Sequence, residues 1–178
     1  VSALPADLAA TMLPADLIRD DEIIILLLRP SMLYIPLTSL GGIAAAVVVA
    51  LALAYLARFP WIIWTDSQAF GVGVGLVTLR LAWQSLEWWN RVFVLTDRRI
   101  IRRMGVLRVS VFESSLRNIE HTSVFMQLRE RIFGLGTIGF ATSGSDVFDA
   151  FWVMIRKPFT VHRIVTDAIR RYGNHPSR

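Results

Sequence analysis

Hydrophobic residues run almost without interruption through the first half of the chain. No charged residue occurs from Ser31 to Ala57, and the densest apolar part is Leu37–Ala57. About 20 apolar residues are needed to cross a hydrocarbon layer of about 30 Å. A helix that is apolar on every face would be unusual in the core of so small a soluble protein. The pattern therefore predicts a membrane-spanning helix over Leu37–Ala57.

A second, less apolar span is predicted over Ala69–Trp89, after a break at Arg58–Pro60. Gly71 and Gly75 form a small-xxx-small pair that allows another helix to approach closely. Two interpretations stay open for its polar side chains: they reach the lipid headgroups, or with the glycines they face a protein partner. These polar residues, spaced four and three apart on one helical face, are Arg80, Gln84 and Glu87.

The two spans predict a hairpin with a defined orientation. The short connection carries Arg58, opposed by Asp66. Positively charged residues favour the cytoplasmic side of a membrane. We therefore expect both termini and the C-terminal domain to lie in the cytoplasm. The arginines that follow the second span most closely are Arg98, Arg99, Arg102 and Arg103.

The segment before the first span combines a small repeat with an apolar run. The motif LPADL occurs at Leu4–Leu8 and again at Leu13–Leu17, either as sequence drift or as a docking arm. Ile23–Leu28 is too short to cross a bilayer and predicts a buried strand or an interfacial segment. The chain is accordingly divided into an N-terminal arm (1–36), a helical hairpin (37–90) and a C-terminal domain (91–178).

The C-terminal part changes to the pattern of an α+β domain. Short alternating segments such as "RVFVLT", "RIIRR" and "VLRVSVFE" predict strands, with tight turns at Asp97–Arg98 and Met104–Gly105. "MQLRERIF" predicts a helical turn. In Thr160–Tyr172 apolar residues recur every three to four positions, which predicts an amphipathic helix capped by Thr160. Many short strands and one final helix favour a curved sheet or barrel that the helix closes.

Composition sharpens the division into two parts. The 178 residues are 54% hydrophobic and carry a net charge of +5. Residues 1–90 hold four arginines against seven acidic residues, whereas residues 91–178 hold fifteen basic residues against seven acidic ones. Such asymmetry indicates that the two halves face different surroundings. The chain has no cysteine, which excludes disulfides, thiolate-ligated metals and a thiol nucleophile.

Motifs for catalysis or cofactor binding are weak. The stretch Gly134–Gly139 matches G-x-G-x-x-G, but it leads into a strand-like segment and no acidic residue follows at the required distance. His121, His162 and His175 have no metal-ligand spacing, and "TSGSD" predicts a polar loop. We expect no catalytic, cofactor-binding or metal-binding residue, and hence no enzyme. The basic residues occur without a nucleic-acid-binding motif, so nucleic acid is not an expected partner.

Two motifs connect the chain with a known family. The hydrophobic spans run into "VLTDRRIIRRMGVL", and "RIFGLGTIGF" follows later. In this order the chain resembles the bacterial pleckstrin-homology-like proteins of the membrane-flanked domain family, over roughly Asp20–Tyr172. The resemblance implies seven strands in a bent barrel capped by a C-terminal helix. The chain departs from the family at Lys157–Pro158, where an Asn-Pro step is common, and in the repeated LPADL motif.

Two non-catalytic functions remain. The first is a scaffold or accessory subunit of a larger membrane complex, by analogy with small two-helix subunits of respiratory and photosynthetic complexes. It would bind other integral membrane proteins through Gly71, Gly75 and the polar stripe. The second is recognition of anionic lipid headgroups, alone or as a homo-oligomer. The candidate lipid- or partner-binding residues are Arg98, Arg99, Arg102, Arg103, Arg108 and Arg117.

Overall fold

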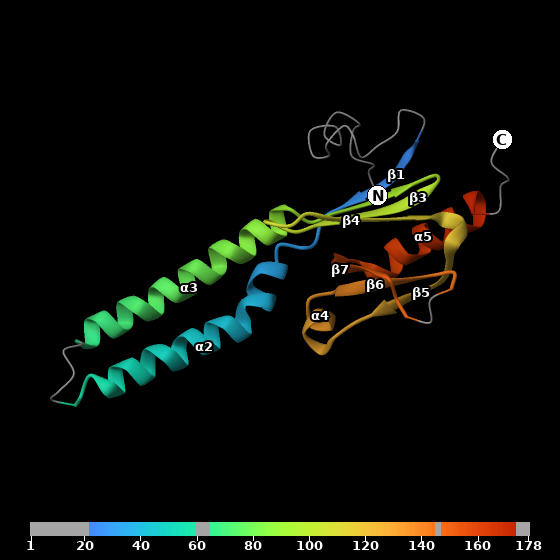
Figure 1. Ribbon diagram of the computed structural model, residues 1–178. Helices are drawn as coiled ribbons and strands as arrows, with labels where there is room; N and C mark the ends of the chain where they lie inside the picture. The colour runs from blue at the N-terminus through green and yellow to red at the C-terminus, as the bar shows by residue number, and fades with distance from the viewer. Residues whose placement is uncertain (1–21, 60–64, 145–146, 174–178) are drawn as a thin grey trace. The chain divides into compact units, whose positions relative to one another are not determined.

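The computed structural model describes residues 22–59, 65–144 and 147–173 and divides the chain into two units. One unit is a helical hairpin, Met32–Trp89. The other combines the segment that ends at Ser31 with Asn90–Arg178. The hairpin is thus an insertion between the first two strands of the second unit (Figure 1).

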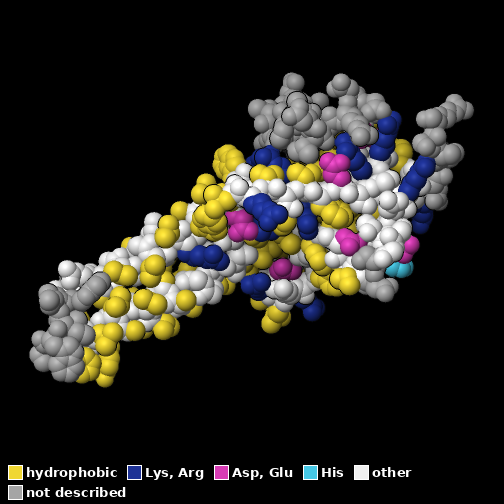
Figure 2. Space-filling model, in the orientation of Figure 1, with side chains coloured by type: hydrophobic (Ala, Val, Ile, Leu, Met, Phe, Trp, Pro, Cys, Tyr) yellow, Lys and Arg dark blue, Asp and Glu magenta, His cyan; other side chains and the backbone are white. Residues whose placement is uncertain are grey.

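The hairpin consists of α2 (Tyr34–Leu56) and α3 (Asp66–Trp89). They run antiparallel, since Gly42 lies against Arg80 while Gly73 lies against Ala50. Both helices are long and apolar enough to cross a membrane, judged by length and composition. On the face that Figure 2 shows, hydrophobic side chains gather along them. The two predicted helices are confirmed, and each begins three residues earlier than the sequence pattern indicated.

The first sheet is antiparallel and places its four strands in chain order. Gly105 adopts φ +108° in the turn between the third and fourth strands, where an added Cβ would lie 2.0 Å from the carbonyl oxygen of Arg108. Only glycine suits this turn. The strands are β1 (Ile24–Leu28), β2 (Val92–Thr96), β3 (Arg99–Met104) and β4 (Ser110–Ser115).

The second sheet has three antiparallel strands in the order β5-β6-β7, and a helix closes the chain. A 3-10 turn, η2, connects the two sheets, and the short α4 interrupts the path from β5 to β6 (Figure 1). The elements are η2 (Leu116–Asn118), β5 (Ile119–Phe125), α4 (Leu128–Ile132), β6 (Leu135–Thr142), β7 (Ala150–Arg156) and α5 (Pro158–Tyr172).

One hydrophobic core joins both sheets and α5. Trp152 is fully buried, with its ring centroid 5.7 Å from that of Phe93 and 4.9 Å from that of Phe140. Val161 and Val165 of α5 belong to the same buried cluster. The amphipathic helix therefore covers the apolar faces that the strands leave open. The described part of the chain has seven strands followed by a helix, as the resemblance implied.

Two predicted boundaries are wrong. The predicted arm 1–36 is not separate, because β1 pairs with β2 from Ile24↔Thr96 to Leu28↔Phe93 and completes the first sheet. The LPADL repeats lie outside the described residues. Thr160 does not cap the last helix, because α5 begins at Pro158 with Lys157 at the N-cap. Proline favours the first turn of a helix, since it lacks an N–H that would stay unbonded there.

Candidate functional site

The predicted polar stripe of α3 faces α2. The side chain of Arg80 lies over Gly42, where an added Cβ would be 2.8 Å from the Arg80 Nε. Its Nη2 donates to the carbonyl oxygen of Thr38 at 3.4 Å. Gln84 is 2% exposed and donates from Nε2 to Glu87 Oε2 at 3.1 Å. Arg80 therefore contacts α2, and Gln84 is bonded to Glu87 within α3.

The glycine pair lies elsewhere on α3. Gly71 and Gly75 are exposed, and a Cβ added at either one would meet nothing within 4 Å. Gly71 and Arg80 are nine residues apart, which at 100° per residue places them on opposite sides of the helix. The single partner face predicted from sequence is thus two faces, and only the glycine face is open.

Three buried polar atoms lie in the hairpin and have no hydrogen-bond partner among the described residues: Ser39 Oγ, Arg80 Nε and Gln84 Oε1. Ser39 is fully buried. Polar groups of this kind are costly against an apolar surface, so helices in an apolar solvent turn them toward one another. The burial explains how α3 can carry Arg80 and Gln84 and still present an apolar outer surface.

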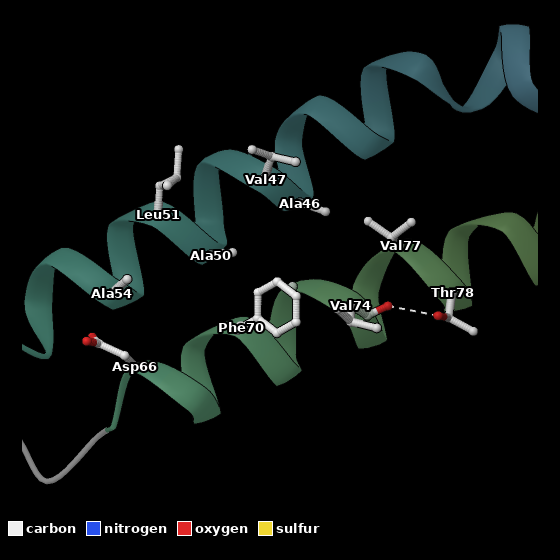
Figure 3. Close-up of a pocket in the computed structure, with 11 residues that line it drawn as sticks. Ala46, Val47, Ala50, Leu51, Ala54, Asp66, Phe70, Val74, Val77 and Thr78 are labelled. Atoms are coloured by element: carbon white, nitrogen blue, oxygen red, sulfur yellow. Dashed lines mark hydrogen bonds between the residues drawn. The ribbon is translucent and has the colours of Figure 1, made fainter.

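An apolar groove of about 530 Å³ runs along one side of the hairpin (Figure 3). On α2 it is lined by small residues that include Ala46, Ala50 and Ala54. Phe70, Val74, Val77 and Thr78 line it from α3, with Asp66 at the end near the connection. The Thr78 hydroxyl is bonded internally to the carbonyl oxygen of Val74 at 2.9 Å. The groove therefore offers shape and apolar contact, with one carboxylate at its end.

Arg99 belongs to an ion-pair network on the outer face of the first sheet. Its Nε donates to Glu22 at 3.0 Å and its Nη1 donates to Glu113. The side chains of Arg99 and Glu22 are only 15% and 2% exposed. Burial alone would lower the pKa of Arg99, but the hydrogen bonds and charges of Glu22 and Glu113 outweigh burial and raise that pKa. Arg99 therefore stabilises the sheet and is not open to a ligand.

Arg102 lies on the opposite face of the same strand, because strand residues alternate. Its guanidinium carbon is 5.6 Å from the ring centroid of Phe112, which allows a cation–π contact. Burial, followed by the charge of Arg91, lowers the pKa of Arg102 below its usual value. The folded domain thus disfavours the charge at Arg102 and favours the charge at Arg99.

The six candidate arginines lie at two ends of the domain. Arg98 and Arg117 are close together, since the Leu116 N–H donates to the Arg98 carbonyl at 2.9 Å. At the other end, Arg103 pairs with Val92, three residues after α3 ends, and Arg108 lies in the following turn. Three residues of chain span at most about 11 Å. Of the two groups, the one with Arg102, Arg103 and Arg108 lies at the end of the first sheet that the chain enters directly after α3.

Catalytic chemistry has little basis in the described residues. No three of their histidine or acidic side chains gather as a metal site would require. His162 Nε2 lies 3.0 Å from the hydroxyl of Thr122, and His175 lies outside the described residues. Gly134–Gly139 enters β6, so the prediction that this motif leads into a strand is confirmed. A dinucleotide site would need a helix there.

Sequence reasoning missed an exposed apolar surface around α4. The segment was interpreted only as a helical turn, but Leu128 and Ile132 are 77% and 72% exposed. Their alternation with Arg129 and Arg131 was a visible signal. It did not predict exposure, because a five-residue helix is too short to define a buried face.

A family model agrees with this architecture. The family model described as "Bacterial PH domain" matches residues 23–168, so the chain belongs to the bacterial PH domain family. The match includes the hairpin as well as both sheets. A crystal structure of a DUF1696 family protein with a pleckstrin-homology domain, from Shewanella loihica PV-4, is similar at 17% identity. The similarity covers 47% of this chain and 70% of that chain, with a TM-score of 0.35. No curated protein matches the chain significantly.

Proposed function

We propose that the protein is a membrane-anchored, non-catalytic binding protein of the bacterial inner membrane. In this proposal α2 and α3 cross the bilayer, and the PH-like unit with both termini lies in the cytoplasm. The observation that best supports this proposal is that an apolar hairpin is inserted between two strands that pair with each other. Because β1 and β2 are neighbours, the chain leaves and re-enters the domain at one end of one sheet. A hairpin attached in this way starts and ends on the same side of a membrane.

The charges support a cytoplasmic domain. The connection between the helices is flanked by Arg58 and Asp66, which cancel. Arg29 precedes α2 by five residues, and Arg91 follows α3 by two. Two more arginines, Arg102 and Arg103, lie opposite the start of β2. Positive charge close to the ends of membrane helices favours the cytoplasmic side.

We propose further that the hairpin docks this protein, as an accessory or stabilising subunit, to a larger membrane complex. Gly71 and Gly75 leave the outer face of α3 open to a second helix. Val74 and Thr78, which line the groove of Figure 3, lie beside that face. Van der Waals contact between closely approaching helices is a main source of association in lipid, so a small-residue face next to a groove suits a partner helix.

The test is co-purification in mild detergent, followed by native-gel sizing and mass spectrometry. The wild-type chain is expected to migrate with integral membrane proteins at a fixed ratio. Gly75→Leu blocks close approach and should release it, while Gly41→Leu is the matched control. Gly41 is also a helical glycine with nothing within 4 Å of an added Cβ, but it lies on α2. Migration of the wild type alone or as a homo-oligomer would contradict the subunit proposal and favour anionic-lipid recognition.

A further inference from the structure

The surface around α4 exposes more large apolar side chains than a soluble domain usually does. Leu128, Ile132 and Phe133 are 77%, 72% and 52% exposed. The helix is nevertheless well fixed, because Glu130 is 4% exposed and its Oε2 accepts from the Gln127 N–H at 3.2 Å. This capping interaction occupies the carboxylate of Glu130, the acidic residue of the segment. The apolar side chains therefore project from a rigid base.

A second segment adds to the same surface. The Lys157 N–H donates to the carbonyl oxygen of Gly134 at 3.4 Å, and Pro158 packs so closely on Gly136 that an added Cβ would lie 2.8 Å from its Cγ. Phe159, the next residue, is 67% exposed. We call residues 128–133 together with Lys157 and Phe159 the α4 tip. It is a single surface formed by two segments distant in sequence.

The charges of the α4 tip have one sign at its surface. Arg129, Arg131 and Lys157 are exposed, whereas Glu130 is buried. Apolar side chains flanked by exposed cations are typical of segments that bind the interface of an anionic membrane. The four large apolar side chains of the tip are each more than half exposed. Exposed side chains of this kind suit insertion into the boundary between headgroups and acyl chains.

The chain connects the α4 tip to the start of α2 by a short path. The Ser31 N–H donates to the Met154 carbonyl oxygen at 2.9 Å. Ser31 precedes Tyr34 of α2 by three residues, and Met154 precedes Lys157 by three. Each three-residue stretch spans at most about 11 Å.

We propose that the α4 tip is a second membrane contact. Leu128, Ile132, Phe133 and Phe159 enter the boundary between headgroups and acyl chains, while Arg131 and Lys157 pair with phospholipid phosphates. The tip would fix the PH-like unit against the bilayer. This inference rests on the proposed membrane anchoring of the hairpin, and the experiment is designed to separate the two.

The experiment uses the full chain, which has no cysteine of its own. Single cysteines at Ile132, Ser143 and Val48 are labelled with an environment-sensitive fluorophore and reconstituted into vesicles that contain phosphatidylglycerol and spin-labelled lipid. Ser143 is the matched control, an exposed residue just after β6 in the same unit. Val48 of α2 reports anchoring. Quenching is expected at Ile132 and Val48 and not at Ser143.

The lipid dependence completes the test. Removing a cation should weaken the preference for anionic vesicles at Ile132 about fivefold per charge. Arg131→Gln and Lys157→Gly are suitable, the second because Lys157 adopts φ +52°, which glycine accepts. Quenching at Val48 with none at Ile132 would overturn the proposal, as would quenching at Ile132 that phosphatidylcholine supports equally well. Burial of the label at Ile132 only when native membrane proteins are present would also overturn it, in favour of a protein contact. Absence of quenching at Val48 would instead contradict the anchoring.

Discussion

The two units of this protein sort the same amino-acid types in opposite ways. In the hairpin, Val48, Leu51 and Phe70 are 65%, 65% and 73% exposed, while Ser39 and Gln84 are buried. In the PH-like unit, Trp152 and Phe140 are fully buried, and most arginines lie at the surface. Burial of apolar area stabilises a fold only against water. This difference is what the proposed membrane anchoring of the hairpin requires.

The α4 tip is an exception within the PH-like unit. Leu128 and Ile132 follow the rule of the hairpin, with apolar side chains turned outward. Exposed apolar patches on soluble domains commonly mark binding sites. This exposed patch is the observation that supports the proposed membrane contact of the PH-like unit.

The largest effect is expected in the core of the PH-like unit. Trp152→Ala removes a fully buried ring that packs on Phe93 and Phe140, and should lower the free energy of unfolding by about 3–5 kcal/mol. Chemical denaturation of the full chain in detergent, followed by near-UV circular dichroism, measures it. The control Leu107→Ala, at a site 86% exposed, should change it by less than about 0.5 kcal/mol. Equal effects of the two substitutions would contradict the assignment of Trp152 to the buried core of this unit.

A smaller effect separates two arginines on β3. Arg99→Met leaves the carboxylate of Glu22 buried without its partner and should cost about 2–3 kcal/mol. Arg102→Met replaces the cation–π contact with Phe112 by an apolar one and removes a charge that burial and Arg91 disfavour, so it should change stability by at most about 1 kcal/mol, toward greater stability.

The directions of the pKa shifts give the sign and the pH range. The raised pKa of Arg99 means that its contribution is fully present at neutral pH and is lost only as pH rises through the guanidinium range. The pKa of Arg102 is lowered, so its charge destabilises the folded state at neutral pH. This destabilisation is lost as pH rises through the same range. Unfolding in guanidinium chloride at pH 7 and pH 9 should give the same difference for each variant. Equal destabilisation by the two substitutions would show that the network has no special role.

Two glycine substitutions distinguish the two faces of α3. Gly73→Leu places side-chain atoms where a Cβ alone would lie 2.7 Å from the Cβ of Ala50, so it should destabilise the hairpin by about 1–3 kcal/mol. Gly75→Leu should leave hairpin stability unchanged. Disulfide trapping between cysteines introduced on α2 and α3 reports the packing. Loss of trapping in both variants would contradict the assignment of an open glycine face.

The sequence predicted helices and strands better than it predicted which of them pack or pair with one another. An uninterrupted apolar run predicted α2, a mostly apolar run with polar residues on one face predicted α3, and the apolar spacing predicted α5. The pairing of β1 with β2 joins segments about 65 residues apart in the chain, and no local pattern specifies it. The role of Arg99 depends on Glu22 and Glu113, so its spacing on β3 could not reveal that it is already paired.

Local sequence patterns also do not specify which surfaces of the folded chain are open to a partner. Helical periodicity correctly grouped Arg80 and Gln84, but it could not decide whether they face α2 or a partner. The decision follows from Gly42, whose missing side chain leaves room for Arg80. The α4 tip was overlooked because exposure is a property of the folded unit, and its apolar residues resemble those of a core helix.

The most direct test of the account is the sidedness of the chain in intact cells. Single cysteines at Ser67, Val48 and Ser143 sample the first turn of α3 next to the helix connection, the middle of α2 and the PH-like unit. With a membrane-impermeant maleimide applied to spheroplasts, Ser67→Cys should react directly, Ser143→Cys only after permeabilisation, and Val48→Cys in neither case. Reaction at Val48, or equal protection of Ser67 and Ser143 until permeabilisation, would contradict a membrane-spanning hairpin.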